Sequence, residues 1–305
     1  MTSQSSVSQP EQVQVNHQQS PAWQSWRSSR SKQRLVGTTI TYIVLIAGAA
    51  ILMIPLFWMI STSIKPQDQI YTYPIVWIPR EIVWQNYPLV FESVAFARFL
   101  WNSTILSVFG IVGNVVGSSL AAYGFARFRF PGRTVLFVIM LSTMMVPAWV
   151  TMIPTFIIFK ELGWLNTYLP LLVPHYFAQP FYTFLLRQFF LGIPKEMDEA
   201  ARIDGASTWR IFWQIYLPLS NAALITVAIF SFFFHWNELL MPLIYLQSQD
   251  KFPVALGIAS FVSDQTQNFA LMMAAALIAM APLLVIFFFA QRLFIQGVVM
   301  TGVKG

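Results

Sequence analysis

A polar segment with the sequence EAARIDGASTWRIFWQIYLPLS occupies residues 199–220 and separates long apolar runs. Its charged residues can form ion pairs and charge-assisted hydrogen bonds with another polar surface; they are Glu199, Arg202, Asp204 and Arg210. The sequence gives little reason to expect that the chain catalyses a reaction. It shows no paired carboxylates, no metal-ligand cluster, no nucleophile beside a base and no cysteine. We therefore predict no catalytic residue, no metal site and no cofactor bound by this chain.

The pattern of this segment predicts two short helices joined by a corner. Pro194 suits a first helical turn, and Gly205 is well placed to end the first helix. Ser207 or Thr208 can cap the second helix, and Pro218 can end it. Helical spacing puts mostly small side chains on one face, which would let a partner approach closely. That face consists of Met197, Ala200, Ala201, Asp204 and Thr208. The alternative is a loop that only connects apolar segments.

The composition indicates a membrane protein. Of 305 residues, 56% are hydrophobic and 10% are charged, whereas an ordinary soluble domain is about 25% charged. The formal charge of +6 does not suggest nucleic-acid binding, because the basic residues lie in short groups beside apolar runs, where membrane topology signals occur.

Windows almost free of charge predict an all-α protein with six transmembrane helices. A span needs about 20 apolar residues, and the windows give spans at about 37–60, 102–126, 134–158, 167–188, 222–246 and 270–291. The Gln- and Ser-rich residues 1–36 are expected to form a disordered tail, because so few apolar side chains cannot build a core. Residues 37–305 then form one transmembrane domain.

The distribution of Lys and Arg predicts the orientation. Counted from the N-terminal tail, the alternate segments between spans hold 13 and 5 of these residues. The positive-inside rule places both termini and the loop 194–220 in the cytoplasm. The segments 65–98 and 247–268 are then outside. The first is dense in Trp, Tyr and Pro, which favours an interfacial cap over a substrate contact.

Two further patterns lie inside the predicted spans. Gly113, Gly117 and Ala121 repeat at four-residue spacing, which favours close helix packing over a ligand site. Asn237 and Glu238 lie in the fifth window, where an ionisable residue is costly without a partner. They either line a translocation path or support the structure through bonds to a neighbouring helix or water.

The polar segment resembles the cytoplasmic loop of bacterial ABC-importer permeases. The matching residues are Glu199, Ala200, Ala201, Gly205, Ile215, Leu217 and Pro218. Further stretches resemble the carbohydrate-uptake branch, similar to the smaller maltose-permease subunit; they are TSIKPQDQIYTYPIVWIP, QNYPLVF, FFFHWNELLMPLI and QRLFIQGVVMTGVKG. The resemblance runs from about residue 37 to the C-terminus, and only the Gln- and Ser-rich tail is unusual for the family.

The resemblance implies a type I ABC-importer permease in the bacterial inner membrane, importing a sugar, glycoside or polyol derivative. Implied partners are a second homologous permease chain, two ATP-binding subunits that use ATP and Mg, an extracytoplasmic solute-binding protein and membrane lipids. The loop would be the coupling helix, with Glu199 pairing with a basic residue of the ATPase. Docking residues would be Glu199, Ala200, Ala201, Asp204, Gly205 and Ala206. Gly302 and Lys304 in the C-terminal tail would be a further ATPase contact, and composition alone is equally consistent with a frayed chain end.

Other classes of membrane protein stay open from the residues alone. The chain has no GxxxxGK[ST] loop to hold phosphates, so we predict that it does not hydrolyse ATP itself. A secondary transporter would carry inverted repeats and several charged residues in its spans, and neither is clear. A non-transporting membrane subunit would use the loop for docking alone.

Overall fold

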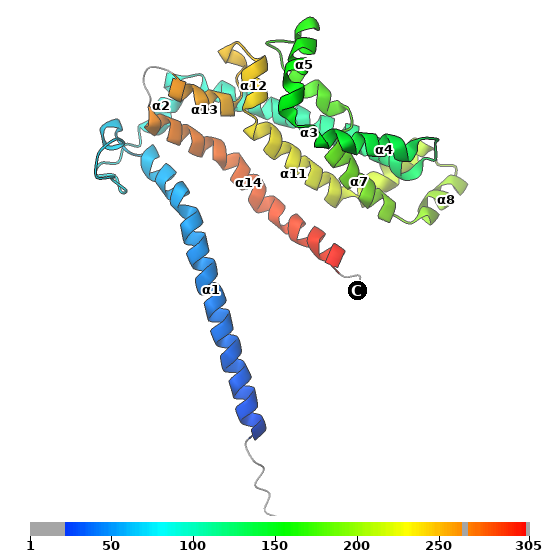
Figure 1. Ribbon diagram of the computed structural model, residues 1–305, viewed down its shortest axis with the longest axis horizontal. Coiled ribbons are helices and arrows are strands. Elements are labelled where there is room, and N and C mark those ends of the chain that lie inside the picture. The colour runs from blue at the N-terminus through cyan, green and yellow to red at the C-terminus, as the bar shows by residue number, and fades with distance from the viewer. Residues whose placement is uncertain (1–21, 264–267, 303–305) are drawn as a thin grey trace, which may run out of the picture. The chain divides into compact units, whose positions relative to one another are not determined.

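The computed structural model describes residues 22–263 and 268–302, and side chains within 36–261 and 268–291 (Figure 1). Every regular element in these residues is helical, which confirms the predicted all-α class. The chain divides into two compact units, Met1–Phe57 and Trp58–Gly305.

Helix α1 (Ala22–Ser63) begins inside the segment expected to be a disordered tail. Residues 22–34 contain no Gly or Pro, so nothing local ends the helix before its apolar part starts. The structure describes a helix from Ala22 onward, and residues 1–21 lie outside the described part of the chain. The division of the chain at residue 37 stays a prediction. The portion Val36–Ser63 of α1 is long and apolar enough to cross a membrane.

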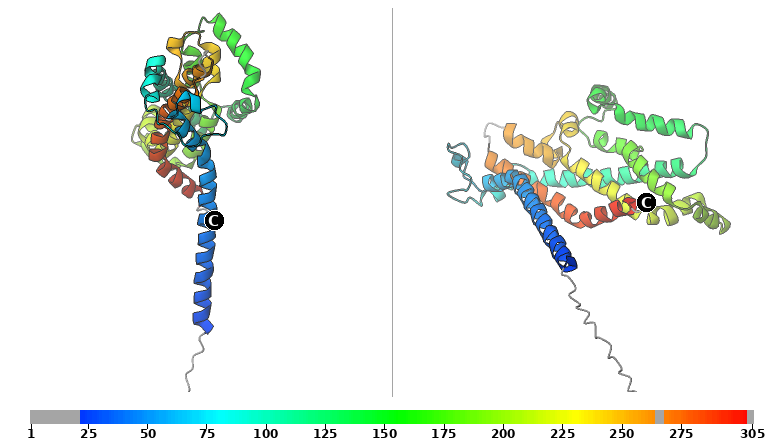
Figure 2. Two further views of the ribbon diagram at one scale, coloured as in Figure 1. Left: turned by 90° about the vertical axis from the view of Figure 1, so that its left-hand side faces the viewer. Right: turned by 60° about the horizontal axis from the view of Figure 1, so that its bottom comes forward.

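Helix α3 (Phe96–Arg127) is the central element of the second unit. Helices α7 (Pro180–Gly192) and α11 (Asn221–Asn237) pack along it (Figure 2). Their contact holds a cluster of buried side chains, and the cluster contains Ala122, Tyr123, Leu186, Phe190, Phe212, Tyr216 and Val227. This core carries the polar loop at one end of α3.

The glycines of α3 let irregular backbone cross the helix. A Cβ atom on Gly113 would lie 2.8 Å from Cδ2 of the Tyr176 ring. A Cβ atom on Gly117 would overlap the Tyr176 carbonyl oxygen. Tyr176 ends η3 (Val173–Tyr176), a short 3-10 helix. The predicted small-residue stripe therefore serves close packing, as expected.

Several of the predicted spans are broken rather than continuous. Three helices are long and apolar enough to cross a membrane, and up to five spans result if each bent pair counts as one. Helix α4 (Arg133–Ser142) with η2 (Thr143–Met145) meets α5 (Ala148–Glu161) at a bend of 101°, where Pro147 interrupts the helix. The number of six spans, and their orientation, therefore stay predictions.

The segment between α1 and α3 forms a small cap held by side-chain bonds to backbone. Asn86, the first residue of α2 (Asn86–Ser93), donates from Nδ2 to the carbonyl oxygens of Ser63 and Lys65 at 2.9 and 3.0 Å. The Lys65 ammonium donates to the Val76 carbonyl and lies 4.1 Å from the Trp58 ring centroid. Burial lowers the pKa of Lys65. Element η1 (Gln67–Gln69) completes this cap.

The C-terminal half of the second unit builds another core against α3. Phe99 and Trp236 pack against α13 (Val254–Ser263) and α14 (Phe269–Gly302). Asn102 Nδ2 donates to the carbonyls of Asp250 and Phe252 at 2.9 and 3.0 Å, which ties the connecting loop to α3. The remaining short elements here are α6 (Leu169–Leu172), α12 (Leu240–Tyr245) and η5 (Gln249–Lys251).

We predict that Gly117→Ala destabilises the protein by about 1–3 kcal/mol, because the new methyl group would overlap the Tyr176 backbone. Gly124→Ala is the matched control on the same helix, since its Cβ would meet only Phe128 Cδ2 at 4.0 Å. The thermal midpoint of the purified protein measures both. Equal midpoints for the two variants would contradict the packing described for η3.

Candidate functional site

Residues 194–220, called the elbow below, contain the two short helices that the residue pattern predicts. Helix α8 (Lys195–Ile203) ends at a corner where Gly205 has φ +77°, a conformation that favours glycine. Helix α9 (Thr208–Ile211) follows, and the Ser207 side chain caps it by accepting from the Arg210 backbone N–H at 3.3 Å. The corner therefore turns the chain back toward the core.

The chain continues from α9 into π-helical η4 (Phe212–Tyr216) and α10 (Leu217–Leu219). The bundle helix α11 begins at Asn221 after a bend of 78°. Pro218 stands at the second position of α10, beside this bend. The elbow is thus joined through backbone to α7 on one side and to α11 on the other (Figure 1).

The predicted docking residues divide between two faces of the elbow. Glu199, Ala200, Asp204 and Gly205 are exposed. Ala201 and Ala206 are half-buried and pack against the core cluster of α3, α7 and η4. One alanine of the EAA triplet thus seats the elbow on its own domain, while its neighbour stays on the open surface. The predicted small-residue face is therefore split, with Thr208 also half-buried and Met197 exposed.

The elbow also exposes large apolar side chains. Ile203 is 86% exposed, and Trp209 and Trp213 are 63% and 57% exposed. Apolar side chains this open beside a carboxylate suit a protein contact, in which an apolar centre is surrounded by polar groups. The elbow therefore presents a mixed surface of Glu199, Ala200 and Ile203.

A buried ion pair anchors the elbow to α3. Arg127, the last residue of α3, places Nε 3.7 Å from Asp198 Oδ2, and the two side chains are 5% and 15% exposed. The Tyr216 hydroxyl donates to Asp198 Oδ1 at 2.7 Å, and the Arg127 guanidinium lies 4.8 Å from the centroid of the Tyr216 ring. These three residues form what we call the Arg127 cluster.

Arg127 also binds the end of α7. Its Nη2 donates to the carbonyl oxygen of Phe190 at 3.0 Å and to that of Ile193. Carbonyls at a helix C-terminus lack intrahelical partners, and a cation there also interacts favourably with the helix dipole. One side chain therefore connects α3, the end of α7, α8 and η4.

Sequence reasoning did not single out the Arg127 cluster. In the sequence, Arg127 is one of the basic residues that predict topology, Asp198 is an acidic residue near the start of a predicted helix, and Tyr216 belongs to a mostly apolar run. Arg127 and Asp198 are 71 residues apart in the sequence, and Asp198 and Tyr216 are 18 apart. Such contacts cannot be predicted from the sequence, because no periodicity relates the end of one helix to a distant loop. One sequence signal points to Asp198. It lies three residues before Ala201, so helical spacing puts both side chains on the same, inward face of α8.

The other predicted site residues lie at the far end of α11. Glu238 follows α11 directly and caps α12, since its Oε1 accepts from the backbone N–H groups of Leu240 and Met241 at 3.0 and 3.1 Å. Asn237 is exposed and donates from Nδ2 to the Phe233 carbonyl at 2.8 Å. Glu238 thus has a structural role, and among the described residues the Asn237 side chain bonds only to its own helix.

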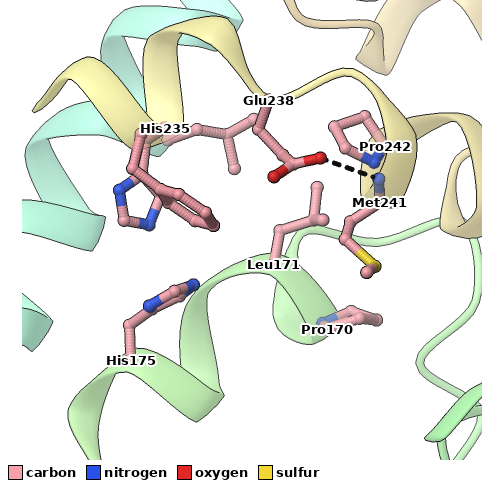
Figure 3. A pocket seen from close by; sticks show the side chains of 9 residues that line it. Pro170, Leu171, His175, His235, Glu238, Met241 and Pro242 are labelled. Atoms are coloured by element: carbon pink, nitrogen blue, oxygen red, sulfur yellow. Dashed lines mark hydrogen bonds between the residues drawn. The ribbon is translucent and has the colours of Figure 1, made fainter. Parts of the chain in front are cut away.

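Glu238 also lines a cavity of about 60 Å³ (Figure 3). The other lining residues are Leu106, Pro170, Leu171, His175, Phe234, His235, Met241 and Pro242, and Asn237 is not among them. The structure therefore brings Glu238 together with two histidines, and it does not bring Asn237 to the cavity.

Beside this cavity, a polar network crosses the apolar core. Asn114 Nδ2 donates to Ser231 Oγ at 2.8 Å, and Asn114 Oδ1 lies 3.3 Å from His175 Nδ1. His235 Nδ1 lies 2.8 Å from the Ser231 carbonyl, and the two histidine rings have centroids 4.5 Å apart. Buried polar groups that bond to one another in this way favour one arrangement of helices, although His235 Nε2 has no hydrogen-bond partner among the described residues. No pattern in the sequence singles out Asn114 or His175.

The predicted C-terminal contact residues fall at the limit of the described chain. Gly302 is the last residue of α14, and Lys304 lies outside the described residues. Their role as an ATPase contact stays a prediction.

Residues 113–300 match the family described as "Binding-protein-dependent transport system inner membrane component". Over 260 residues the chain is 33% identical to the arabinooligosaccharides transport system permease protein AraQ of Halalkalibacterium halodurans, covering 84% of this chain and 93% of that protein. Over 256 residues it is 32% identical to the diacetylchitobiose uptake system permease protein NgcG of Streptomyces coelicolor, covering 83% and 84%.

A third relative is the sn-glycerol-3-phosphate transport system permease protein UgpE of Yersinia pestis, 33% identical over 266 residues that cover 85% of this chain and 94% of that protein. Among solved structures, a chain of a bacterial ABC transporter involved in the import of alginate has a TM-score of 0.74 at 24% identity, covering 86% of this chain and 97% of that chain. This likeness shows the fold. The family resemblance inferred from the motifs is confirmed.

We predict that Arg127→Gln destabilises the protein by about 3–5 kcal/mol, because it leaves the Asp198 carboxylate buried and unpaired. Arg129→Gln is the control, since the exposed Arg129 makes no hydrogen bond or ion pair in the described residues. Thermal unfolding of Arg127→Gln, Asp198→Asn and the double variant measures the coupling between the two residues. Additive losses would show that the pair does not anchor the elbow.

Proposed function

Because this chain belongs to the binding-protein-dependent transport system inner membrane components, we propose that it is one permease subunit of an ATP-driven importer of a sugar or sugar derivative. Its place is the inner membrane. The substrate class follows the names of its relatives, which concern arabinooligosaccharides, diacetylchitobiose and sn-glycerol-3-phosphate. In this proposal the chain forms half of the translocation path, and a second homologous permease forms the other half.

The observation that carries the proposal is the elbow, which combines an open docking face with a buried anchor. Glu199 and Ala200 are exposed, while Ala201 packs on the core and Asp198 pairs with Arg127. A loop that only connects helices has no need of a buried ion pair, whose formation requires desolvation of both charges. An element that transmits force needs both features.

The proposed mechanism begins at two partner ATPase subunits, which bind ATP and Mg. The elbow docks in a groove of one of them, where Glu199 meets a basic side chain and Ala200 permits close approach. When the ATPases close, the elbow moves with the groove. The Arg127 cluster passes this displacement to the ends of α3 and α7, and the backbone passes it to α11. The helices then alternate between an arrangement that opens the path to one side of the membrane and one that opens it to the other side.

A solute-binding protein is the proposed partner on the opposite side of the membrane. A structural neighbour with a TM-score of 0.58 is a bacterial alginate ABC transporter solved in complex with an alginate pentasaccharide-bound periplasmic protein. The segments 65–98 and 247–268 are the proposed contact regions of this chain, of which residues 264–267 lie outside the described part.

Glu238 is proposed to contribute to the path in addition to capping α12. Its carboxylate is half-buried and lines the cavity beside His175 and His235. Asn237, one residue before it, is exposed and is proposed to face the path or the second permease chain.

Glu199→Lys is predicted to abolish ligand-stimulated ATP hydrolysis, because it reverses the charge at the docking face without touching the Arg127 cluster. The measurement uses the complete assembly in lipid with its binding protein and a panel of sugars and polyol derivatives. Glu161→Lys, at the exposed end of α5, is the matched control and should keep the stimulation seen with the unaltered chain.

Two results would contradict the proposed function. An assembly without ATPase activity under any ligand would support a secondary transporter instead. ATPase subunits that co-purify without ligand-stimulated hydrolysis would support a docking subunit that does not transport.

Glu238→Gln is predicted to raise the half-saturating ligand concentration for uptake by about tenfold or more, as expected for the loss of a hydrogen bond to a charged group, while thermal stability changes little. The stability is retained because the Gln side-chain oxygen can still accept from Leu240 and Met241. Direct uptake by vesicles containing the assembly measures the first quantity. Unchanged uptake with altered assembly would leave Glu238 with its structural role alone.

A further inference from the structure

An unpaired group of arginines lies where α3 ends and α4 begins. Arg129, Arg133 and Arg187 have no carboxylate partner among the described residues. The nearby Asp198 carboxylate pairs with Arg127 instead. Arg133 is on α4 and Arg187 is on α7, and these two helices are in contact. Such a group of like charges attracts an anion.

The partners of these arginines are neutral and leave most of their donors open. Arg133 donates from Nη1 to the Phe128 carbonyl at 3.1 Å, and Arg187 donates from Nε to the Phe125 carbonyl at 3.3 Å. Arg129 is exposed and makes no hydrogen bond in the described chain. Each guanidinium has five N–H groups, and its planar fork suits phosphate oxygens.

Two of these arginines, Arg129 and Arg133, border a surface hollow of about 370 Å³. Its walls consist of Arg129, Phe130, Gly132, Arg133, Thr134 and Val135. Gly132 has φ +79°, so the turn that shapes the hollow requires a residue free of a side chain. This volume lies within the range of small-ligand sites.

An exposed apolar helix face continues from the hollow. On α4, Val135, Leu136, Val138 and Ile139 are 51–62% exposed. A ligand that fills the hollow and follows this face must therefore have an anionic head and an apolar body. The predicted orientation places the hollow at the cytoplasmic surface, where anionic lipids attract Arg and Lys.

We propose that this hollow binds the phosphate headgroup of an anionic phospholipid of the cytoplasmic leaflet, with its acyl chains along α4. Arg129 and Arg133 contact the phosphate oxygens, and the Thr134 hydroxyl is available as a further donor. The site stands two residues beyond Arg127, so the bound lipid lies beside the attachment of the elbow. The inference rests on the predicted orientation and not on the identity of the transported sugar.

Titration of the delipidated, purified assembly with phosphatidylglycerol or phosphatidylcholine, followed by native mass spectrometry, tests this site. Phosphatidylglycerol should bind more tightly than phosphatidylcholine. Arg129→Gln/Arg133→Gln should weaken phosphatidylglycerol binding on the order of tenfold, and Arg129→Gln alone should weaken it severalfold without disturbing any internal contact. Arg80→Gln/Arg98→Gln removes the same charge from two exposed positions elsewhere and should leave the affinity within about twofold.

Three outcomes would overturn the proposal. Phosphatidylglycerol binding that is equal in the Arg129→Gln/Arg133→Gln variant and the unaltered chain would remove the site. Displacement of the lipid by millimolar inorganic phosphate would indicate a free-anion site. Loss of the ATPase subunits from the double variant, with lipid affinity unchanged, would indicate a protein-docking surface. Ligand-stimulated ATP hydrolysis, measured in parallel, separates these results from a failure of the transport function.

Discussion

The position of the elbow depends on the burial of a single cation. Arg127 is 5% exposed, and a charge so placed requires a partner of opposite charge. Its Nη2 also has hydrogen-bond acceptors, whereas its Nε has only the ion-pair contact with Asp198 at 3.7 Å. Asp198 supplies the opposite charge from α8, while the carbonyls of Phe190 and Ile193 accept from the guanidinium. Displacing the elbow alone would leave this cation unpaired in the protein interior. The low-energy displacement therefore carries α3, the end of α7 and the elbow together, which is the property that a coupling element requires.

A second constraint governs the helices themselves. In a lipid environment, backbone that leaves the helical path must find partners or small neighbours inside the protein. Two such breaks occur near the cavity. Element η3 crosses α3 at glycines, which have no side chain to block the approach. After α11, the Glu238 carboxylate accepts from two backbone N–H groups. Asn114, Ser231 and His235 bond to one another across the same region. Since α11 runs from the elbow to this polar region, one rigid helix connects the docking face to the proposed path.

Local patterns in the sequence predicted the helical class, the corner at Gly205 and the close packing of the α3 glycines, because each depends on residues near one another along the chain. They could not predict that Ala200 and Ala201 serve opposite faces, since that choice depends on which side of α8 meets the core. The partners of Arg127 come from α7, α8 and η4, so only the folded arrangement reveals them. Helix α1 begins within the polar segment, because polarity alone does not end a helix that continues into an apolar span.

The central claim is that elbow and α3 move as one body, and paired spin labels measure this directly. The chain contains no cysteine, so Ile203→Cys on the elbow and Leu120→Cys on α3, both exposed positions, can be labelled selectively in the assembled transporter when its partner chains carry no reactive cysteine. The account predicts the same narrow distance distribution before and after ATP binding, and a broader distribution in Arg127→Gln. A distance that changes on ATP binding while Arg127 and Asp198 are intact would contradict it.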